Sequence, residues 1–217
     1  MSQRENSHAN QPVLGVGPGL DESKAAMVMI HGRGASAQDI LGLTAELNAE
    51  GMTFIAPQAA NNAWYPHSFL EPMDKNEPFL TDALNLLAAT MQSIQEAGIP
   101  AERTVLLGFS QGACLTSEFV ARNARRFGGL CALSGGLIGP PGTPREYEGS
   151  LAGTPVFLGC SDVDFHIPVE RVHETDEVLK SLGGDVTTSI YPGMGHTINL
   201  DEIEQVQKIV DQVLAAN

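Results

Sequence analysis

The sequence predicts an α/β fold in which a mostly parallel sheet is covered by helices on both faces. Two observations support this: short, continuous apolar runs alternate with helical patterns, and this alternation extends over most of the chain. Strands that are apolar on both faces are typical of parallel sheets buried between helix layers. With 217 residues, of which 42% are hydrophobic, the chain is large enough for one domain with a sizeable core.

The first elements are two expected strands with a helix between them. The apolar runs at 26–30 and 52–56 predict buried strands. Between them, apolar residues recur at helical spacing over 38–49, until Gly51 ends the pattern.

A long loop and the central strand–helix pair come next. The loop at 57–76 is rich in Pro, Asn and aromatic residues, and a helix is expected over 78–97, followed by Gly98. An apolar run at 104–107 predicts a further strand, and residues 113–126 form a helix-favouring stretch directly after it.

The last part of the chain repeats the alternation around a connection rich in glycine and proline. The elements expected there are strands at 130–133, 155–158 and 186–191, helices at 169–182 and 201–216, and the connection at 134–153. The final helix is amphipathic, as expected for one that packs on a sheet.

The sequence predicts one domain preceded by an N-terminal extension. Residues 1–20 are polar and then punctuated by glycine and proline, which predicts a flexible N-terminal arm. Residues 21–217 show no linker and no internal repeat, so they are expected to form a single domain.

Charge and composition exclude several classes of function. The net charge is −14, which argues against nucleic acid and anionic membranes as partners. No apolar stretch reaches the ~20 residues of a membrane span, so stable membrane insertion is not expected. The N-terminus lacks the apolar core of a secretory signal, and the cysteines, Cys114, Cys131 and Cys160, lie apart in apolar segments. We expect buried thiols in a cytoplasmic protein, with no metal and no cofactor.

The most informative motif is Gly108-Phe109-Ser110-Gln111-Gly112, between an expected strand and an expected helix. A serine at such a sharp turn has its hydroxyl held clear of the backbone, where a substrate carbonyl can reach it. Glycines two residues on either side allow neighbouring backbone to pack closely around the turn.

An acid and a histidine follow later strands, in the chain order serine, acid, histidine. The carboxyl ends of parallel strands meet at one edge of a sheet, which would bring Ser110, Asp164 and His196 together. Ser110 is expected to be the nucleophile, His196 the base and Asp164 the acid that orients the imidazole. Asp162 competes with Asp164 for the third role.

These motifs resemble the phospholipase/carboxylesterase family of small α/β-hydrolases, related to acyl-protein thioesterases. The matching stretches span residues 30 to 200 and are 31–36, 64–66, 108–113, 164–168 and 193–197. The resemblance implies an α/β-hydrolase fold without a large lid domain, and it favours Asp164, which stands four residues before Pro168. Phe165 departs from the family pattern, in which proline commonly follows the acid.

The tetrahedral intermediate of such a reaction needs backbone N–H donors. One is expected from Gln111, which follows the nucleophile at the start of the helix. The resemblance places the second at Arg33. We interpret the neighbouring His31 as a structural residue that holds this oxyanion loop.

The loop at 57–76 contains the only tryptophan of the chain and is expected to form a wall over Ser110. The alternative is that it only covers the edge of the sheet. The candidate substrate-binding residues are Trp64, Tyr65, Phe69, Leu70 and His166. His67 is a further candidate for the pocket, whereas His8 and His173 are expected to be solvated.

These features predict a serine carboxylesterase that hydrolyses short-to-medium carboxylic esters through an acyl-serine intermediate. The alternatives are an acyl thioesterase or a lysophospholipase, because the same three side chains attack all these carbonyls. A non-catalytic hydrolase-fold binding protein is a remote alternative, since such proteins usually lose a triad member. The expected partner is a small-molecule ester, and a homodimer is left open.

Overall fold

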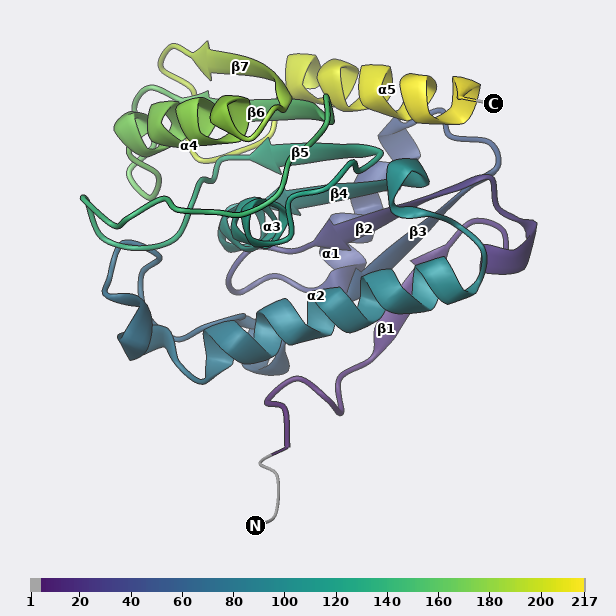
Figure 1. Ribbon diagram of the computed structural model, residues 1–217, viewed down its shortest axis with the longest axis horizontal. Coiled ribbons are helices and arrows are strands. Elements are labelled where there is room, and N and C mark those ends of the chain that lie inside the picture. Colours follow the sequence, from purple (N-terminus) through teal and green to yellow (C-terminus); the bar gives the residue numbers. More distant parts are fainter. Residues whose placement is uncertain (1–4, 217) are drawn as a thin grey trace.

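A single sheet forms the centre of the computed structural model, which describes residues 5–216. Within that part of the chain, seven strands lie in the order β1-β3-β2-β4-β5-β6-β7. The strands are β1 Val13–Val16, β2 Ala25–Ile30, β3 Met52–Pro57, β4 Thr104–Phe109, β5 Gly129–Leu133, β6 Pro155–Ser161 and β7 Asp185–Tyr191. β1 is antiparallel to β3, and the other pairs are parallel, so the carboxyl ends of β2 to β7 share one edge (Figure 1).

Helices cover both faces of the sheet, which confirms the predicted fold class (Figure 1). They are α1 Ala37–Leu41, α2 Phe79–Glu96, α3 Gln111–Arg122, α4 Val169–Ser181 and α5 Leu200–Ala215. One buried apolar cluster joins α2, α3 and α4 to the sheet, and a second joins α1 and α5 to its other face. No large extra domain interrupts the described residues.

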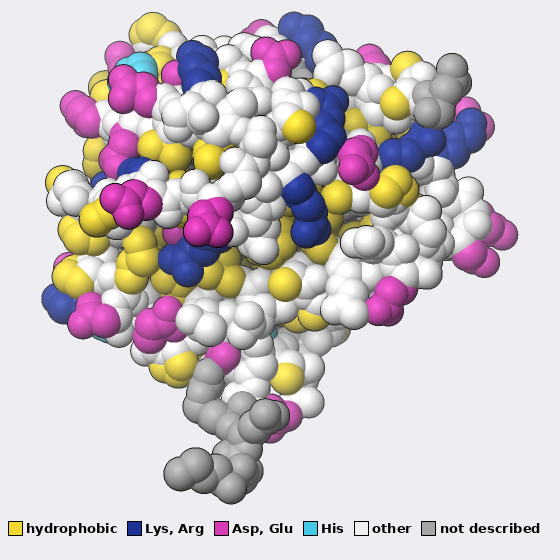
Figure 2. Space-filling model, viewed as in Figure 1, with side chains coloured by type: hydrophobic (Ala, Val, Ile, Leu, Met, Phe, Trp, Pro, Cys, Tyr) yellow, Lys and Arg dark blue, Asp and Glu magenta, His cyan; other side chains and the backbone are white. Residues whose placement is uncertain are grey.

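Charged side chains are distributed over the molecular surface. Figure 2 shows Asp and Glu side chains across the visible face, interspersed with Lys and Arg. The net charge of −14 is therefore not gathered in one acidic patch on this face. Among residues 5–216, no helix combines the length and apolar character that a membrane span requires.

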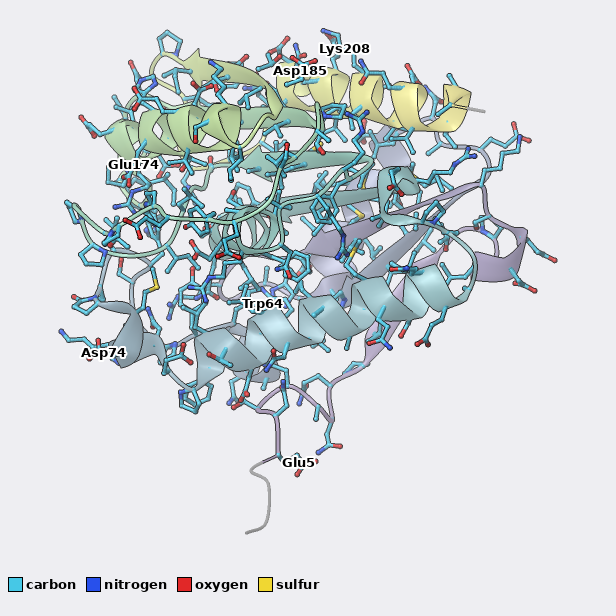
Figure 3. All side chains as sticks on the ribbon, in the orientation of Figure 1. Glu5, Trp64, Asp74, Glu174, Asp185 and Lys208 are labelled. Atoms are coloured by element: carbon cyan, nitrogen blue, oxygen red, sulfur yellow. The ribbon has the colours of Figure 1, made fainter. Side chains whose placement is uncertain are left out.

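The N-terminal segment differs from the expected flexible arm over 1–20. Residues 13–16 form β1, because the outer edge of β3 offers unpaired backbone groups that a short strand can bond. Before β1, the hydroxyl of Ser7 donates to Asp82 (2.6 Å), and the ring of His8 packs at a tilt of 58° against the ring of Trp64. The chain thus runs from Glu5 at the surface to a contact with an interior side chain (Figure 3). Residues 1–4 of the predicted arm, and residue 217 of the predicted domain, lie outside the described residues.

The helix expected over 38–49 is shorter than predicted. Its N-terminus has a capping box, in which Ser36 and Asp39 bond each other's backbone N–H groups. α1 ends at Leu41, and the chain continues as a 3₁₀ turn, Gly42–Glu46. The spacing of the apolar residues suits either kind of helix over so few residues, so periodicity alone could not locate this change.

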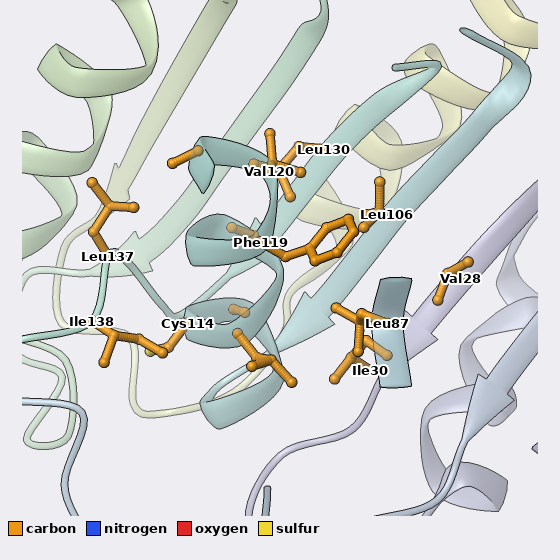
Figure 4. Packing of buried hydrophobic residues seen from close by; sticks show 14 of the residues in the cluster. Val28, Ile30, Leu87, Leu106, Cys114, Phe119, Val120, Leu130, Leu137 and Ile138 are labelled. Carbon is orange, nitrogen blue, oxygen red and sulfur yellow. The ribbon is translucent and has the colours of Figure 1, made fainter. Parts of the chain in front are cut away.

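α3 is the central helix of the fold. Every residue from Gln111 to Ala121 is buried, and its side chains Phe119 and Val120 belong to the same core cluster as Leu106 of β4 and Leu130 of β5 (Figure 4). Burial on this scale makes α3 a rigid element. The residue at its N-terminus, Ser110, is therefore held firmly at the carboxyl edge of the sheet.

Candidate active site

Ser110 lies at a sharp turn between β4 and α3. Its backbone has φ 56° and ψ −120°, a conformation that is strained by about 1–3 kcal/mol in a residue with a side chain. Gly112 permits the turn, because a Cβ atom there would overlap the carbonyl of Ile30. Gly108 is equally restricted, since its added Cβ would overlap the backbone of Gly112. The glycines of the motif are thus required by close backbone approach, as the sequence predicts.

Ser110, His196 and Asp164 form a continuous hydrogen-bonded chain. The hydroxyl oxygen of Ser110 lies 2.8 Å from Nε2 of His196, and Nδ1 of His196 lies 2.6 Å from Oδ2 of Asp164. A carboxylate can only accept, so the proton of a neutral imidazole stands on Nδ1 and Nε2 accepts from the serine hydroxyl. Three residues distant in sequence are in this way arranged for transfer of a proton from serine to histidine.

Asp164 is held as an ionised, oriented carboxylate. Burial by itself would raise its pKa, but hydrogen bonds from His196 and from the N–H groups of His166 (2.8 Å) and Ile167 (3.1 Å) outweigh this and lower it. The competing carboxylate, Asp162, is exposed and instead accepts from the N–H of Gly193 (2.7 Å). The structure therefore brings Asp164 to His196, while Asp162 joins the acid loop to the histidine loop.

His31 holds the loop after β2. The ring is fully buried, Nε2 accepts from the N–H of Ala59 (3.1 Å), and Nδ1 donates to the carbonyl of Gly32 (2.8 Å). Burial lowers the pKa of His31, so the ring is neutral and suits this pair of bonds. This is the structural position expected from the sequence, and it presents Gly32 within close contact of Ser110.

Arg33 and Gln111, the residues expected to supply oxyanion-hole N–H groups, both line the cavity beside Ser110. Their side chains have a second role that the sequence did not indicate. The guanidinium of Arg33 donates to the carbonyls of Tyr65 (2.9 Å), Pro66 (2.7 Å) and His67 (2.6 Å). The amide of Gln111 donates to Tyr65 (2.9 Å) and accepts from the N–H of Trp64 (2.9 Å). The two side chains thereby fix the aromatic loop against the serine.

The cavity in front of Ser110 has a volume of about 410 Å³ and is open to solvent. Of the predicted substrate-binding residues, Tyr65, Phe69 and His166 line it, and so does His67. Phe109, inside the serine motif, and Ile167, beside the acid, also line it. Sequence reasoning missed these two, although Phe109 directly precedes Ser110 and Ile167 stands three residues after Asp164.

Trp64 and Leu70 do not line this cavity, in contrast to the prediction. The indole of Trp64 is fully buried and donates to the carbonyl of His31 (2.8 Å). His8, expected to be solvated, is 1% exposed, and its ring lies 5.5 Å from that of Trp64. The indole of Trp64 therefore faces the core and supports the loop after β2 through His31, because a buried indole N–H needs an acceptor.

The buried thiols expected from the sequence are present. Cys114, Cys131 and Cys160 are free and buried, and burial raises the pKa of the Cys114 and Cys160 thiols to about 12. Cys114 lies one turn of α3 beyond Ser110, and with so high a pKa it is a poor nucleophile. Within the described residues no cluster of three His, Cys, Asp or Glu side chains suited to a metal ion occurs.

A model of one protein family, described as phospholipase/carboxylesterase, matches residues 13–214 of the sequence. The chain belongs to this family. A family member of known structure, the phospholipase/carboxylesterase of Dyadobacter fermentans, is 43% identical and superimposes with a TM-score of 0.89 over 93% of this chain and 96% of that one. The family and this superposition show an α/β-hydrolase fold, and they make the chain a serine hydrolase.

More distant relatives include acyl-protein thioesterases. Acyl-protein thioesterase 1 of Debaryomyces hansenii is 25% identical over 94% of this chain and 97% of its own length. The Bacillus cereus carboxylesterase superimposes with a TM-score of 0.74 at 18% identity, over 96% of this chain and 97% of that one, a likeness of fold alone.

Proposed function

We propose that this member of the phospholipase/carboxylesterase family is a serine carboxylesterase that hydrolyses short-to-medium carboxylic esters through an acyl-Ser110 intermediate. The observation that carries the proposal is the hydrogen-bonded chain from Ser110 through His196 to Asp164. A serine hydroxyl is a weak nucleophile, and this arrangement is the one that activates it.

In the first half of the reaction, Ser110 Oγ attacks the ester carbonyl while its proton passes to Nε2 of His196. The carbonyl π bond opens, and the negative charge moves to the oxygen, which the backbone N–H groups of Gln111 and Arg33 stabilise. The intermediate then collapses: the bond to the alcohol breaks, and the alcohol oxygen takes the proton from Nε2. The alcohol leaves, and the acyl group stays on Ser110.

In the second half, a water molecule gives a proton to Nε2 of His196 and attacks the acyl carbon. Collapse of this second intermediate breaks the bond to Oγ, which recovers the proton from Nε2. The products are a carboxylic acid and the free enzyme. Asp164 stabilises the imidazolium in both halves without taking up its proton.

The shape of the cavity supports a short or medium acyl group. It is open, and Tyr65, Phe69 and Ile167 give it apolar walls without a covering domain. Thioester hydrolysis is the second candidate, favoured by the relatives named acyl-protein thioesterase 1. The same three side chains would act on lysophospholipids, and a non-catalytic binding protein would have no need for the complete chain of hydrogen bonds.

A fluorophosphonate probe tests the nucleophile. We expect one label per chain at Ser110, lost in Ser110→Ala and kept in the control Ser68→Ala, because Ser68 lines the same cavity without a bond to His196. Turnover of p-nitrophenyl acetate should disappear in His196→Ala. If Ser110→Ala still takes up the probe and hydrolyses the ester, the proposal is wrong.

A second measurement separates the substrate classes. Values of kcat/KM for p-nitrophenyl esters of increasing acyl length are compared with those for acyl-coenzyme A thioesters and a lysophospholipid. We expect a maximum among short-to-medium esters. A clear preference for the thioester or the lysophospholipid would move the assignment to that alternative.

A further inference from the structure

The loop that follows β6 presents an aromatic side chain to solvent beside His196. Phe165 is 80% exposed. Its ring centroid lies 4.3 Å from that of His166 and 6.4 Å from that of His196. The rings of His166 and His196 are in turn 4.8 Å apart in an edge-on arrangement. Phe165 is thus the outer member of a group of three rings that begins at His196.

The reaction chemistry decides which part of a substrate meets these rings. Nε2 of His196 must reach the alcohol oxygen to protonate it, so the alcohol part of the ester lies on the His196 side of the scissile bond. Phe109, whose ring is 4.9 Å from that of His196, and His166 both line the cavity there. Phe165 does not itself line the cavity but lies next to His166 on the side away from His196, so an alcohol group would have to extend outward past His166 to meet it.

The backbone around Phe165 is held in place. Oδ1 of Asp164, which precedes Phe165 in the chain, accepts from the N–H groups of His166 and Ile167, which follow it. The N–H of Val163 donates to the hydroxyl of Ser161 (3.1 Å). The ring therefore projects from a fixed loop, and binding against it costs little ordering of the backbone.

The exposed position of the Phe165 side chain contributes little to the stability of the free enzyme. A side chain that remains 80% exposed gains little from burial, and its ring neighbours within the described residues are His166 and, farther away, His196. An aromatic partner can pack against such a ring, offset-stacked or edge-on, at centroid distances of about 4.5–7 Å. The arrangement is that of an open aromatic surface beside the leaving-group position.

We propose that Phe165, together with His166, forms a subsite for a planar aromatic group in the leaving alcohol, so that aromatic-alcohol esters are a preferred substrate class. This inference rests on the proposed esterase function and specifies its substrate. Phe165 acts in it as a specificity-determining residue, because it contacts the alcohol part and takes no part in proton transfer.

Benzyl acetate and cyclohexylmethyl acetate test the subsite. Both release a primary alcohol of similar size and basicity, and they differ in the planarity and π-electrons of the ring. We expect wild type to favour the benzyl ester in kcat/KM, and Phe165→Leu to reduce that preference roughly 2- to 10-fold, which is the contribution of one aromatic contact. Phe165→Tyr should retain it, and so should Val163→Ala, since Val163 is an exposed side chain (59%) of the same loop.

Ethyl acetate distinguishes failure of the subsite from failure of the esterase proposal. Its alcohol is too short to reach Phe165, so wild type and Phe165→Leu should hydrolyse it equally. If they do, and the benzyl preference is nevertheless unchanged in Phe165→Leu, the subsite is refuted while the esterase stands. Equal losses for both ring esters would also refute it, since they would indicate a general apolar contact. If Ser110→Ala hydrolyses ethyl acetate, the esterase proposal itself fails.

Discussion

Replacing Gln111 by methionine tests whether the side chain after the serine holds the aromatic loop. Methionine has a similar length, but it lacks the amide donor and acceptor. The substitution removes two hydrogen bonds of the Gln111 side chain. One is accepted from the backbone N–H of fully buried Trp64, and the other is donated to the carbonyl of Tyr65. The backbone N–H of Gln111, expected to act on the oxyanion, is left in place.

The two lost bonds should differ in cost. The carbonyl of Tyr65 keeps a bond from Arg33 (2.9 Å), so losing the bond from Gln111 should cost little. The backbone N–H of Trp64 would be left buried without its acceptor, which costs about 1–3 kcal/mol. For a chain of this size each kcal/mol lowers the melting temperature by about 2–4 °C.

Guanidinium unfolding monitored by tryptophan fluorescence measures the free energy, and p-nitrophenyl butyrate hydrolysis measures the site. We expect the free energy of unfolding to fall by about 1–3 kcal/mol and KM to rise more than kcat falls, because the wall bearing Tyr65 loosens while the attacking serine stays anchored. Gln95→Met, on an exposed position of α2, is the control and should stay within about 0.5 kcal/mol of wild type. If Gln111→Met matches this control in both stability and KM, the loop does not depend on Gln111.

Three further substitutions address the carboxylates. Asp164→Asn should lower kcat by about 10⁴-fold, because an amide stabilises the wrong tautomer of His196. Asp162→Asn should retain activity, since its amide oxygen can still accept from the N–H of Gly193. Similar losses of p-nitrophenyl acetate turnover in both variants would contradict this assignment. Glu202 is fully buried near Gly159, and burial raises its pKa from 4.5 to about 7. Because the folded pKa lies above the unfolded one, the protonated group contributes stability below pH 4.5 that is lost as the pH rises through about 7. Glu202→Gln removes this pH dependence. The free energy of unfolding of the variant minus that of wild type should therefore increase by about 1–3 kcal/mol between pH 5 and pH 8. If this difference is the same at both pH values, Glu202 is not a buried, protonated carboxyl.

Much of the fold could be predicted because its signals are local. Continuous apolar runs identify β2 and β4, since a strand buried on both faces needs apolar side chains at every position. The positions of Ser110, Asp164 and His196 after their strands follow from the parallel topology, which brings the carboxyl ends together. Their assembly within hydrogen-bonding distance agrees with that reasoning.

Other features depend on partners far away in the sequence. β1 has four residues, of which one is glycine, and it becomes a strand because β3 has a free edge. An aromatic loop residue can face a cavity or the core. Trp64 faces the core, where its indole N–H donates to the carbonyl of His31. Asp162 and Asp164 are equivalent in type and two residues apart, so residue type and position after the strand leave both open, and only the family resemblance favours Asp164.

The sequence by itself determined the α/β architecture, the serine turn and the gathering of a serine, an acid and a histidine at one edge of the sheet, because hydrophobic periodicity and a glycine-flanked turn are properties of short segments. Only the tertiary structure decided that the N-terminal segment joins the sheet, that Trp64 lies beneath the site, and that Arg33 and Gln111 hold the loop in front of Ser110. Each of these depends on which buried donor meets which acceptor, and that is settled when the whole chain has packed.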